Sequence, residues 1–106
     1  MKIKLTDDSR ADLRIIRDNL KAFNDSGFRF VDEITQHIAT LSASSKIGPS
    51  LETKVDFPTG YRFLVFYLTK RQLYLIIYRI NENDQVIYIN RIFDGRSNYL
   101  NVLFKD

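Results

Sequence analysis

The apolar residues of this chain follow two different periods, one typical of helices in the first part and one typical of strands in the last. Lysines alternate with apolar residues over Lys2–Leu5, which predicts a short edge strand. Over Asp8–Phe23 and again over Phe30–Leu41, apolar residues recur at spacings of three and four, which predicts two amphipathic helices. Only the polar break Asn24–Gly27 separates them, so we expect a helical hairpin whose apolar stripes face a common surface.

The last part of the chain contains three runs rich in β-branched and aromatic residues, namely Tyr61–Leu68, Leu73–Ile80 and Val86–Phe93. The connections between them have hairpin length, which predicts an antiparallel meander. Before the meander, the small and polar residues of Ser42–Gly60 indicate a connecting loop rather than a linker between domains.

The order of these elements predicts an α+β fold. We expect an N-terminal edge strand and a helical hairpin packed on a three- to four-stranded antiparallel sheet, in a single domain over residues 1–106. After the meander, Asp94–Ser97 indicates a turn. The pattern of Tyr99–Phe104 fits either a last helical turn or a tail.

Both faces of the predicted meander are largely apolar. The hairpins predict that Leu68 pairs with Leu73 and Ile80 with Ile87. One face then carries Arg62, Leu64, Phe66, Leu75, Ile77, Arg79, Tyr88, Asn90 and Ile92, and the other carries Tyr61, Phe63, Val65, Tyr67, Tyr74, Ile76, Tyr78, Ile87, Ile89, Arg91 and Phe93. Because two helices cover only one face, we expect an exposed apolar patch on the other, which requires a protein partner or an oligomer. A register slip of one residue would leave both faces apolar.

Composition restricts the compartment and the chemistry. The chain has no cysteine, no long apolar run for a membrane span and no apolar segment of a secretory signal at its N-terminus, so we expect a cytoplasmic protein. Its formal charge of +3 favours acidic or nucleic-acid partners only mildly. The sequence contains no motif for nucleotide hydrolysis, serine hydrolysis or zinc proteolysis, and we expect no cofactor and no metal.

Two segments of the meander resemble a known family. Tyr74–Ile80 reads YLIIYRI, and Val86–Arg96 reads VIYINRIFDGR after a short acidic turn. Together they resemble toxins of the RelE/ParE superfamily, and more closely the ParE branch, which carries a YLIxYRI strand and a second strand ending in an R-V-x-H-G-R-like motif. The helical hairpin and the polar loop that precede them agree with the order of elements in that family.

The resemblance implies a toxin of a type II toxin–antitoxin module. A cognate antitoxin would lie over the apolar surface in a hetero-oligomer, and the positions matching that surface are Phe63, Val65, Tyr74, Ile76 and Tyr78. In the ParE branch the target is DNA gyrase, which the toxin poisons without covalent chemistry of its own. In the RelE branch the toxin cleaves messenger RNA on the ribosome, and since one fold supports both functions, the fold does not choose between them.

Two departures from the family pattern disfavour the nuclease. Leu75 stands where RelE-type nucleases carry an arginine, and Asp94 stands where many relatives have a histidine. RNA cleavage needs a base, an acid and cations for the developing charge. The residues that remain for such a site are Lys54, Arg62, Arg79, Arg91, Arg96 and Tyr99. A third alternative is a degenerate module that binds its antitoxin but is not toxic. The replacement of the family histidine by Asp94 is compatible with this alternative.

For the gyrase-binding alternative, the predicted target-binding residues are Arg79, Arg91, Asp94 and Arg96. Arginines in strand interiors need a carboxylate, a carbonyl or a partner protein. For Arg79 and Arg91, an ion pair with Asp56 or Asp94 is the structural explanation, and contact with a target or antitoxin is the functional one. Arg96 follows Gly95 in a turn, where exposure favours a functional role.

Overall fold

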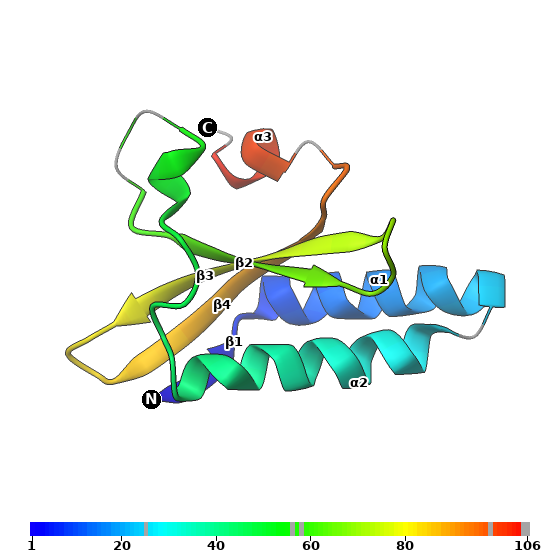
Figure 1. Cartoon of the computed structure of the whole chain (residues 1–106), viewed down its shortest axis with the longest axis horizontal. Helices are drawn as coiled ribbons and strands as arrows, with labels where there is room; N and C mark the ends of the chain where they lie inside the picture. The colour runs from blue at the N-terminus through cyan, green and yellow to red at the C-terminus, as the bar shows by residue number, and fades with distance from the viewer. Residues whose placement is uncertain (25, 56, 58, 98, 105–106) are drawn as a thin grey trace.

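The computed structural model describes residues 1–24, 26–55, 57, 59–97 and 99–104. Its elements are β1 (Lys2–Leu5), α1 (Asp7–Asn24), α2 (Ser26–Ala39), the short 3-10 turns η1 (Thr40–Ser42) and η2 (Leu51–Thr53), β2 (Arg62–Tyr67), β3 (Leu73–Asn81), β4 (Val86–Asp94) and α3 (Tyr99–Leu103). Figure 1 shows α1 and α2 side by side on one side of the sheet, with α3 on the other. The predicted α+β class is confirmed.

Local signals explain where the helical hairpin begins and why its helices approach so closely. Thr6 precedes α1, and its Oγ1 accepts a hydrogen bond from the Ser9 N–H at 3.2 Å, which satisfies one free donor of the first turn. Near the start of α2, a Cβ on Gly27 would lie 2.5 Å from the backbone oxygen of Arg17. Only glycine permits this contact between the helices.

The sheet has four strands in the order β1-β4-β3-β2. Strands β2, β3 and β4 form the predicted antiparallel meander, whereas β1 pairs with β4 in parallel. The helices carry the chain across one face of the sheet from β1 at one edge to β2 at the other, and the meander then brings β4 back beside β1. α2 is bound to the far edge strand, because Arg29 donates to the Leu68 carbonyl at 2.8 Å and His37 Nε2 lies 3.0 Å from the Val65 oxygen.

The strand register differs from the prediction at two places. At the first hairpin Tyr67, not Leu68, lies opposite Leu73, which exchanges the faces of β2. The predicted pair of Ile80 with Ile87 is confirmed, but a β-bulge interrupts the ladder near Ile77 and exchanges the faces of the end of β4. We expected both faces to remain apolar in either register, and both faces carry apolar residues in the observed one.

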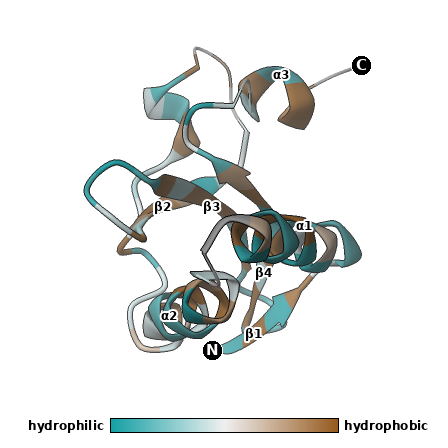
Figure 2. Ribbon diagram, turned by 90° about the vertical axis from the view of Figure 1, so that its right-hand side faces the viewer, coloured by the Kyte–Doolittle hydropathy of each residue, from teal (hydrophilic) through white to brown (hydrophobic). Residues whose placement is uncertain are grey.

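The helix side of the sheet holds the main core. This side also carries Leu64, Phe66 and Ile92. The predicted register had placed these three residues on the opposite face from Tyr74 and Ile76. The fully or largely buried residues are Leu20, Phe30, Ile34, Ile38, Leu41, Phe66, Leu68, Tyr74, Ile76, Tyr78, Ile87, Ile89 and Ile92. Figure 2 shows the hydrophobic strands between the helical hairpin on one side and α3 on the other.

The chain itself covers much of the opposite face, which corrects the expectation of a long uncovered patch there. Leu51, Phe63, Leu75, Ile77 and Phe93 form a smaller second core. The partly buried residues that pack against it come mainly from the C-terminal segment and from β2, namely Tyr61, Val65, Tyr99, Leu100, Leu103 and Phe104. The segment Tyr99–Phe104, whose structure the sequence left open, is helical over Tyr99–Leu103. Its side chains cover part of the second core.

Candidate functional site

The four predicted target-binding residues do not form one site. Tyr74, at the start of β3, lies opposite Asp94, whereas Arg79 lies five residues further along the same strand. At about 3.3 Å per residue, Arg79 is therefore roughly 17 Å from the end of the sheet that carries Asp94 and Arg96. Arg91 lies between these places, on β4.

Arg91 has a structural role at the edge of the sheet. Its guanidinium donates to both carboxylate oxygens of Asp12, on α1, at 2.8 and 3.0 Å. The same carboxylate accepts the N–H of Ile92 at 2.9 Å. β1 pairs with β4 only as far as Ile89, so Asp12 replaces the missing strand partner beyond it. The hydrogen bonds with Asp12 raise the pKa of Arg91 above its ordinary value, and Arg91 stays charged.

For Arg91, the expected ion pair with a carboxylate is present, but the carboxylate is that of Asp12 and not that of Asp94. Asp56, the other partner considered, lies outside the described residues. The sequence carries no signal for this pair, since the two residues are 79 positions apart.

Asp94 and Arg96 shape a turn at the opposite end of the sheet from Arg79. The Asp94 carboxylate accepts the backbone N–H of Arg96 at 2.9 Å, and the Arg96 guanidinium donates to the Arg71 carbonyl at 3.0 Å. A Cβ on Gly95 would lie 2.1 Å from a methyl carbon of Leu73, so this turn packs tightly against the β2–β3 hairpin. Both Asp94 and Arg96 are exposed.

Like Arg91 and Arg96, three further residues considered for a nuclease make contacts within the fold. Arg62 donates to the Gly48 carbonyl at 2.7 Å and so fixes the connecting loop. The ring of Tyr99 packs 6.0 Å from that of Phe93 in the second core. Lys54 lies with its Nζ 5.1 Å from the centre of the Phe63 ring. Lys54 and Tyr99 thus pack against the second core, whereas Arg62 lies on the helix side of the sheet, opposite Tyr78.

Three of the five predicted antitoxin-binding residues lie in the main core. Tyr74 is 4% exposed, and Ile76 and Tyr78 are 0% exposed, so the helical hairpin leaves them no surface for a partner and this part of the prediction is wrong. The Tyr78 hydroxyl accepts the Gly48 N–H at 3.0 Å and donates to the Ser45 carbonyl at 2.8 Å. Burial raises the pKa of Tyr78, so its hydroxyl remains protonated and able to donate. Phe63 is buried in the second core and Val65 is partly exposed.

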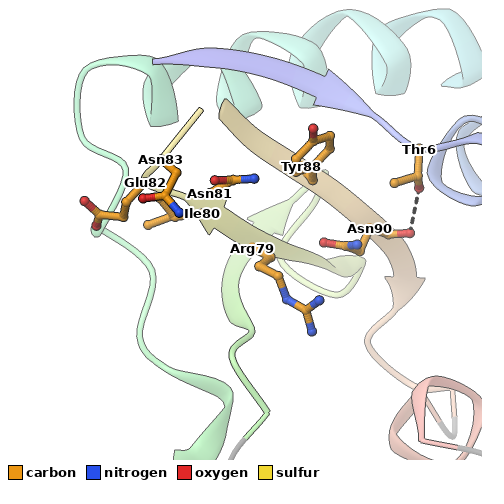
Figure 3. Close-up of a pocket in the computed structure, with 8 residues that line it drawn as sticks. All are labelled: Thr6, Arg79, Ile80, Asn81, Glu82, Asn83, Tyr88 and Asn90. Atoms are coloured by element: carbon orange, nitrogen blue, oxygen red, sulfur yellow. Dashed lines mark hydrogen bonds between the residues drawn. The ribbon is translucent and has the colours of Figure 1, made fainter. Parts of the chain in front are cut away.

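A polar pocket at the β3–β4 hairpin was not predicted as a site. It has a volume of about 500 Å³ and is lined by Thr6, Arg79, Ile80, Asn81, Glu82, Asn83, Tyr88 and Asn90 (Figure 3). The exposed Arg79 lies with its guanidinium carbon 4.2 Å above the Tyr61 ring, and it donates to the Thr59 carbonyl at 3.2 Å. The side-chain oxygen of Asn90 is buried and has no hydrogen-bond partner among the described residues.

One sequence signal would have indicated this pocket. Asn90 and Arg91 are two consecutive polar residues between the apolar residues Ile89 and Ile92, and they interrupt the alternation of the strand. Such an interruption is typical of a β-bulge, and bulges are frequent beside functional sites because they redirect a side chain. The amides, the phenol of Tyr88, the guanidinium of Arg79 and the carboxylate of Glu82 supply hydrogen bonds and two opposite charges. Within the described part of the chain, no group of three or more His, Asp or Glu side chains is placed to hold a metal ion.

The fold is that of a small α+β domain. A family model described as the ParE toxin of type II toxin–antitoxin systems, parDE, matches residues 3–99. The chain belongs to this family of toxins. None of the curated proteins matches the chain.

A solved structure has the same fold. It is described as the chromosomal ParDE toxin–antitoxin system from P. aeruginosa, and it superposes with a TM-score of 0.69. The match covers 89% of this chain and 95% of the other, with 23% sequence identity. At this identity the likeness concerns the fold.

Proposed function

We propose that this ParE-family toxin acts by binding DNA gyrase and that a cognate antitoxin neutralises it in a hetero-oligomer. The observation that carries the proposal is the match to the ParE family over residues 3–99, which includes the two motif strands and the helical hairpin. The proposed target places the protein in the cytoplasm. Among the described residues, no helix is both long and apolar enough to cross a membrane.

Binding rather than RNA cleavage is supported by how the basic residues are used. Arg62 and Arg91 are committed to Gly48 and Asp12, and Tyr99 packs in the second core. A nuclease would need such groups free to reach the scissile phosphate. Arg79 and Arg96 are exposed and remain the arginines of the predicted set that can meet a target.

For the antitoxin, the edge strand β2 offers an apolar surface. Val65 is partly exposed and Tyr67, two positions further on the same face of the strand, is 61% exposed. An exposed apolar surface on a strand edge is a common site for a partner segment. We therefore retain Val65, with Tyr67 added, as the antitoxin-binding surface.

The test is DNA supercoiling by purified gyrase, titrated with this protein alone and with its cognate antitoxin. We expect inhibition with accumulation of cleaved DNA, and restoration of supercoiling when the antitoxin is added. If folded protein leaves supercoiling unchanged, gyrase is not the target. Cleavage of ribosome-bound messenger RNA at defined positions would then identify the nuclease, and harmless expression without antitoxin would identify a non-toxic binding module.

A further inference from the structure

The strand order β1-β4-β3-β2 leaves β1 and β2 at the two edges of the sheet. An edge strand presents backbone N–H and C=O groups to which a strand of another chain can bind, and proteins protect such edges with short strands and charged side chains. β1 is protected in this way, since it has four residues, of which Lys2 and Lys4 are exposed. β2 reads RFLVFY and carries no charge beyond Arg62, so charged side chains of its own do not protect most of its edge.

The hydrogen bonds at the two ends of β2 show which of its residues direct their backbone groups outward. Near the start, the Phe63 N–H donates to the Pro49 carbonyl of the connecting loop at 3.1 Å, away from β3. Just after the end, the Leu68 N–H donates to the Gln72 carbonyl at 2.9 Å, on the side of β3. Successive residues of a strand alternate in direction. The outward residues are therefore Tyr61, just before the strand, and Phe63, Val65 and Tyr67.

The connecting loop closes the first half of this edge. The outward carbonyl of Tyr61 accepts the Leu51 N–H at 2.9 Å. A Cβ on Gly48 would clash with the carbonyl oxygen of Phe63, so the backbone of the loop lies directly against that oxygen. A second strand therefore cannot bind along Tyr61 and Phe63 unless the loop moves away.

Two side chains of α2 close the second half. His37 Nε2 lies 3.0 Å from the Val65 carbonyl oxygen, and the imidazole packs against the Phe66 ring with the centroids 5.5 Å apart. Paired strands place an N–H nitrogen about 2.9 Å from a carbonyl oxygen, so the imidazole nitrogen takes the place that a second strand's N–H would occupy. Arg29 donates to the Leu68 carbonyl at 2.8 Å, which puts a charged group beside the end of β2.

We infer that Arg29 and His37 keep the free toxin from pairing along β2 with a second copy of its own chain. A second copy is the relevant partner, because every molecule in solution presents the same edge. Two copies related by a two-fold axis at Phe66 would pair Val65 of each with Tyr67 of the other. Each such pair exchanges two backbone hydrogen bonds, and in one of them the acceptor is the Val65 carbonyl to which His37 is bound.

The side chains beside the closed edge would favour this pairing if the backbone were open. Tyr67 is 61% exposed and Val65 is partly exposed, and both project from the face of the sheet opposite the helices. Pairs of aromatic and β-branched residues across two strands stabilise a sheet. In the two-fold arrangement each Val65 faces a Tyr67 of the other copy, so the contacts of α2 with the edge are what oppose the pairing.

The inference goes beyond the proposed function and does not depend on the target. The closure concerns the backbone of β2 and not its side chains. Val65 and Tyr67 therefore remain available to an antitoxin that covers the face of the strand. A partner that adds a strand to β2 must first displace Arg29 and His37.

The experiment compares the self-association of the parent, purified without antitoxin, with that of the double variant His37→Leu/Arg29→Met. Leucine and methionine keep an apolar side chain at each position but cannot donate to a carbonyl. The control is Gln36→Leu/Arg14→Met, which makes changes of the same kind at exposed positions. Sedimentation equilibrium measures the dissociation constant of any dimer, and circular dichroism checks that each variant is folded.

We expect the double variant to dimerise about tenfold or more tightly than the parent and the control, because one hydrogen bond of each strand pair becomes available. In the dimer the backbone N–H groups of Val65 and Tyr67 should exchange with solvent more slowly than in the parent. The variant His37→Gln/Arg29→Met should associate less than the leucine variant, since the glutamine amide can donate to the Val65 carbonyl.

Three results would each overturn the inference. The first is a folded double variant that associates no more tightly than the parent. The second is a control that associates as tightly as the double variant. The third is a dimer of the double variant in which exchange at Val65 and Tyr67 is unchanged, since the contact would then lie elsewhere. If the double variant does not fold, the single variant His37→Leu, which frees the Val65 carbonyl alone, is judged by the same criteria.

Discussion

The two faces of the sheet are both buried, but by different means. On one face a hairpin of two full helices covers a core whose centre includes Phe30, Ile34 and Ile76, each 0% exposed. On the other face the cover consists of a five-residue helix, a 3-10 turn and a loop, and Arg79 with the pocket lies on its uncovered part. The comparison indicates that the helix face carries most of the stability, while the opposite face leaves polar groups available for binding.

The largest expected effect that tests this comparison is in the main core. Ile34→Ala should lower the free energy of unfolding by about 2–5 kcal/mol, because it leaves a cavity where the side chain is fully buried. Urea denaturation measures the change. Ile15→Ala is the matched control, since Ile15 is 59% exposed and its truncation should change stability by less than about 0.5 kcal/mol. Equal effects of the two changes would contradict the assignment of the core.

The next effect is at the boundary between the faces, where Asp12 joins α1 to β4. Asp12→Ala should cost about 2–3 kcal/mol, because it leaves the Arg91 guanidinium and the Ile92 N–H without their partner. The control is Asp18→Ala, which breaks the exposed pair with Arg17 and should cost at most about 1 kcal/mol. Chemical denaturation of both variants at pH 7 measures these changes. Equal effects of the two substitutions would mean that the pair of Asp12 with Arg91 does not stabilise the fold.

A smaller effect is expected in the second core. Leu100→Ala should lower the free energy of unfolding by only about 1 kcal/mol, because Leu100 is partly exposed and α3 has room to adjust. Val102→Ala, at a position 50% exposed on the same helix, should have almost no effect. A loss at Leu100 as large as that at Ile34 would mean that the second face is as important for stability as the helix face.

The smallest effect concerns the loop beside Arg79 and depends on pH. The Glu52 carboxylate accepts the Thr59 N–H at 2.6 Å and the Gly60 N–H at 3.2 Å. The Thr59 hydrogen bond is the main cause that lowers the pKa of Glu52 below its ordinary value of 4.5. Because the folded-state pKa is the lower one, the stabilisation is present above about pH 4.5 and is lost as pH falls through the folded-state pKa.

Glu52→Gln tests this pH dependence. The variant should unfold at lower temperature than the parent at pH 7, and the difference should decrease as pH falls below 4.5, where the parent carboxylate becomes protonated. Melting curves between pH 7 and pH 3 measure the difference. A difference that stays constant over this range would mean that the Glu52 charge does not stabilise the loop.

Individual elements show how far sequence patterns predict this fold. The helical hairpin, the three meander strands and the edge strand β1 were all predicted, because each depends on a local period of apolar residues. The parallel pairing of β1 with β4 was missed, and so was the role of α3. Both depend on which distant segments lie next to each other, and the periods of the separate segments contain no such information.

The candidate site shows the same division. The motif around Arg79 and Arg91 was recognised, but their roles were not distinguished, because the difference lies in Asp12 on α1 and Tyr61 before β2. Asn90 was assigned to a face by simple alternation, and the bulge changed its surroundings. A local polar pair in the strand was the signal that alternation alone overlooked.

The sequence by itself determined the helical hairpin, the four strands, the α+β class and the ParE family of this protein, since periodic burial and short motifs are properties of neighbouring residues. Only the tertiary structure decided the register of β2, the bulge at Asn90, the Asp12–Arg91 pair and the cover that α3 provides. These features arise when segments up to 84 positions apart compete for the same hydrogen-bonding groups and the same buried surface. That competition is settled by packing in three dimensions, and it leaves Arg79 exposed while it binds Arg91 into the fold.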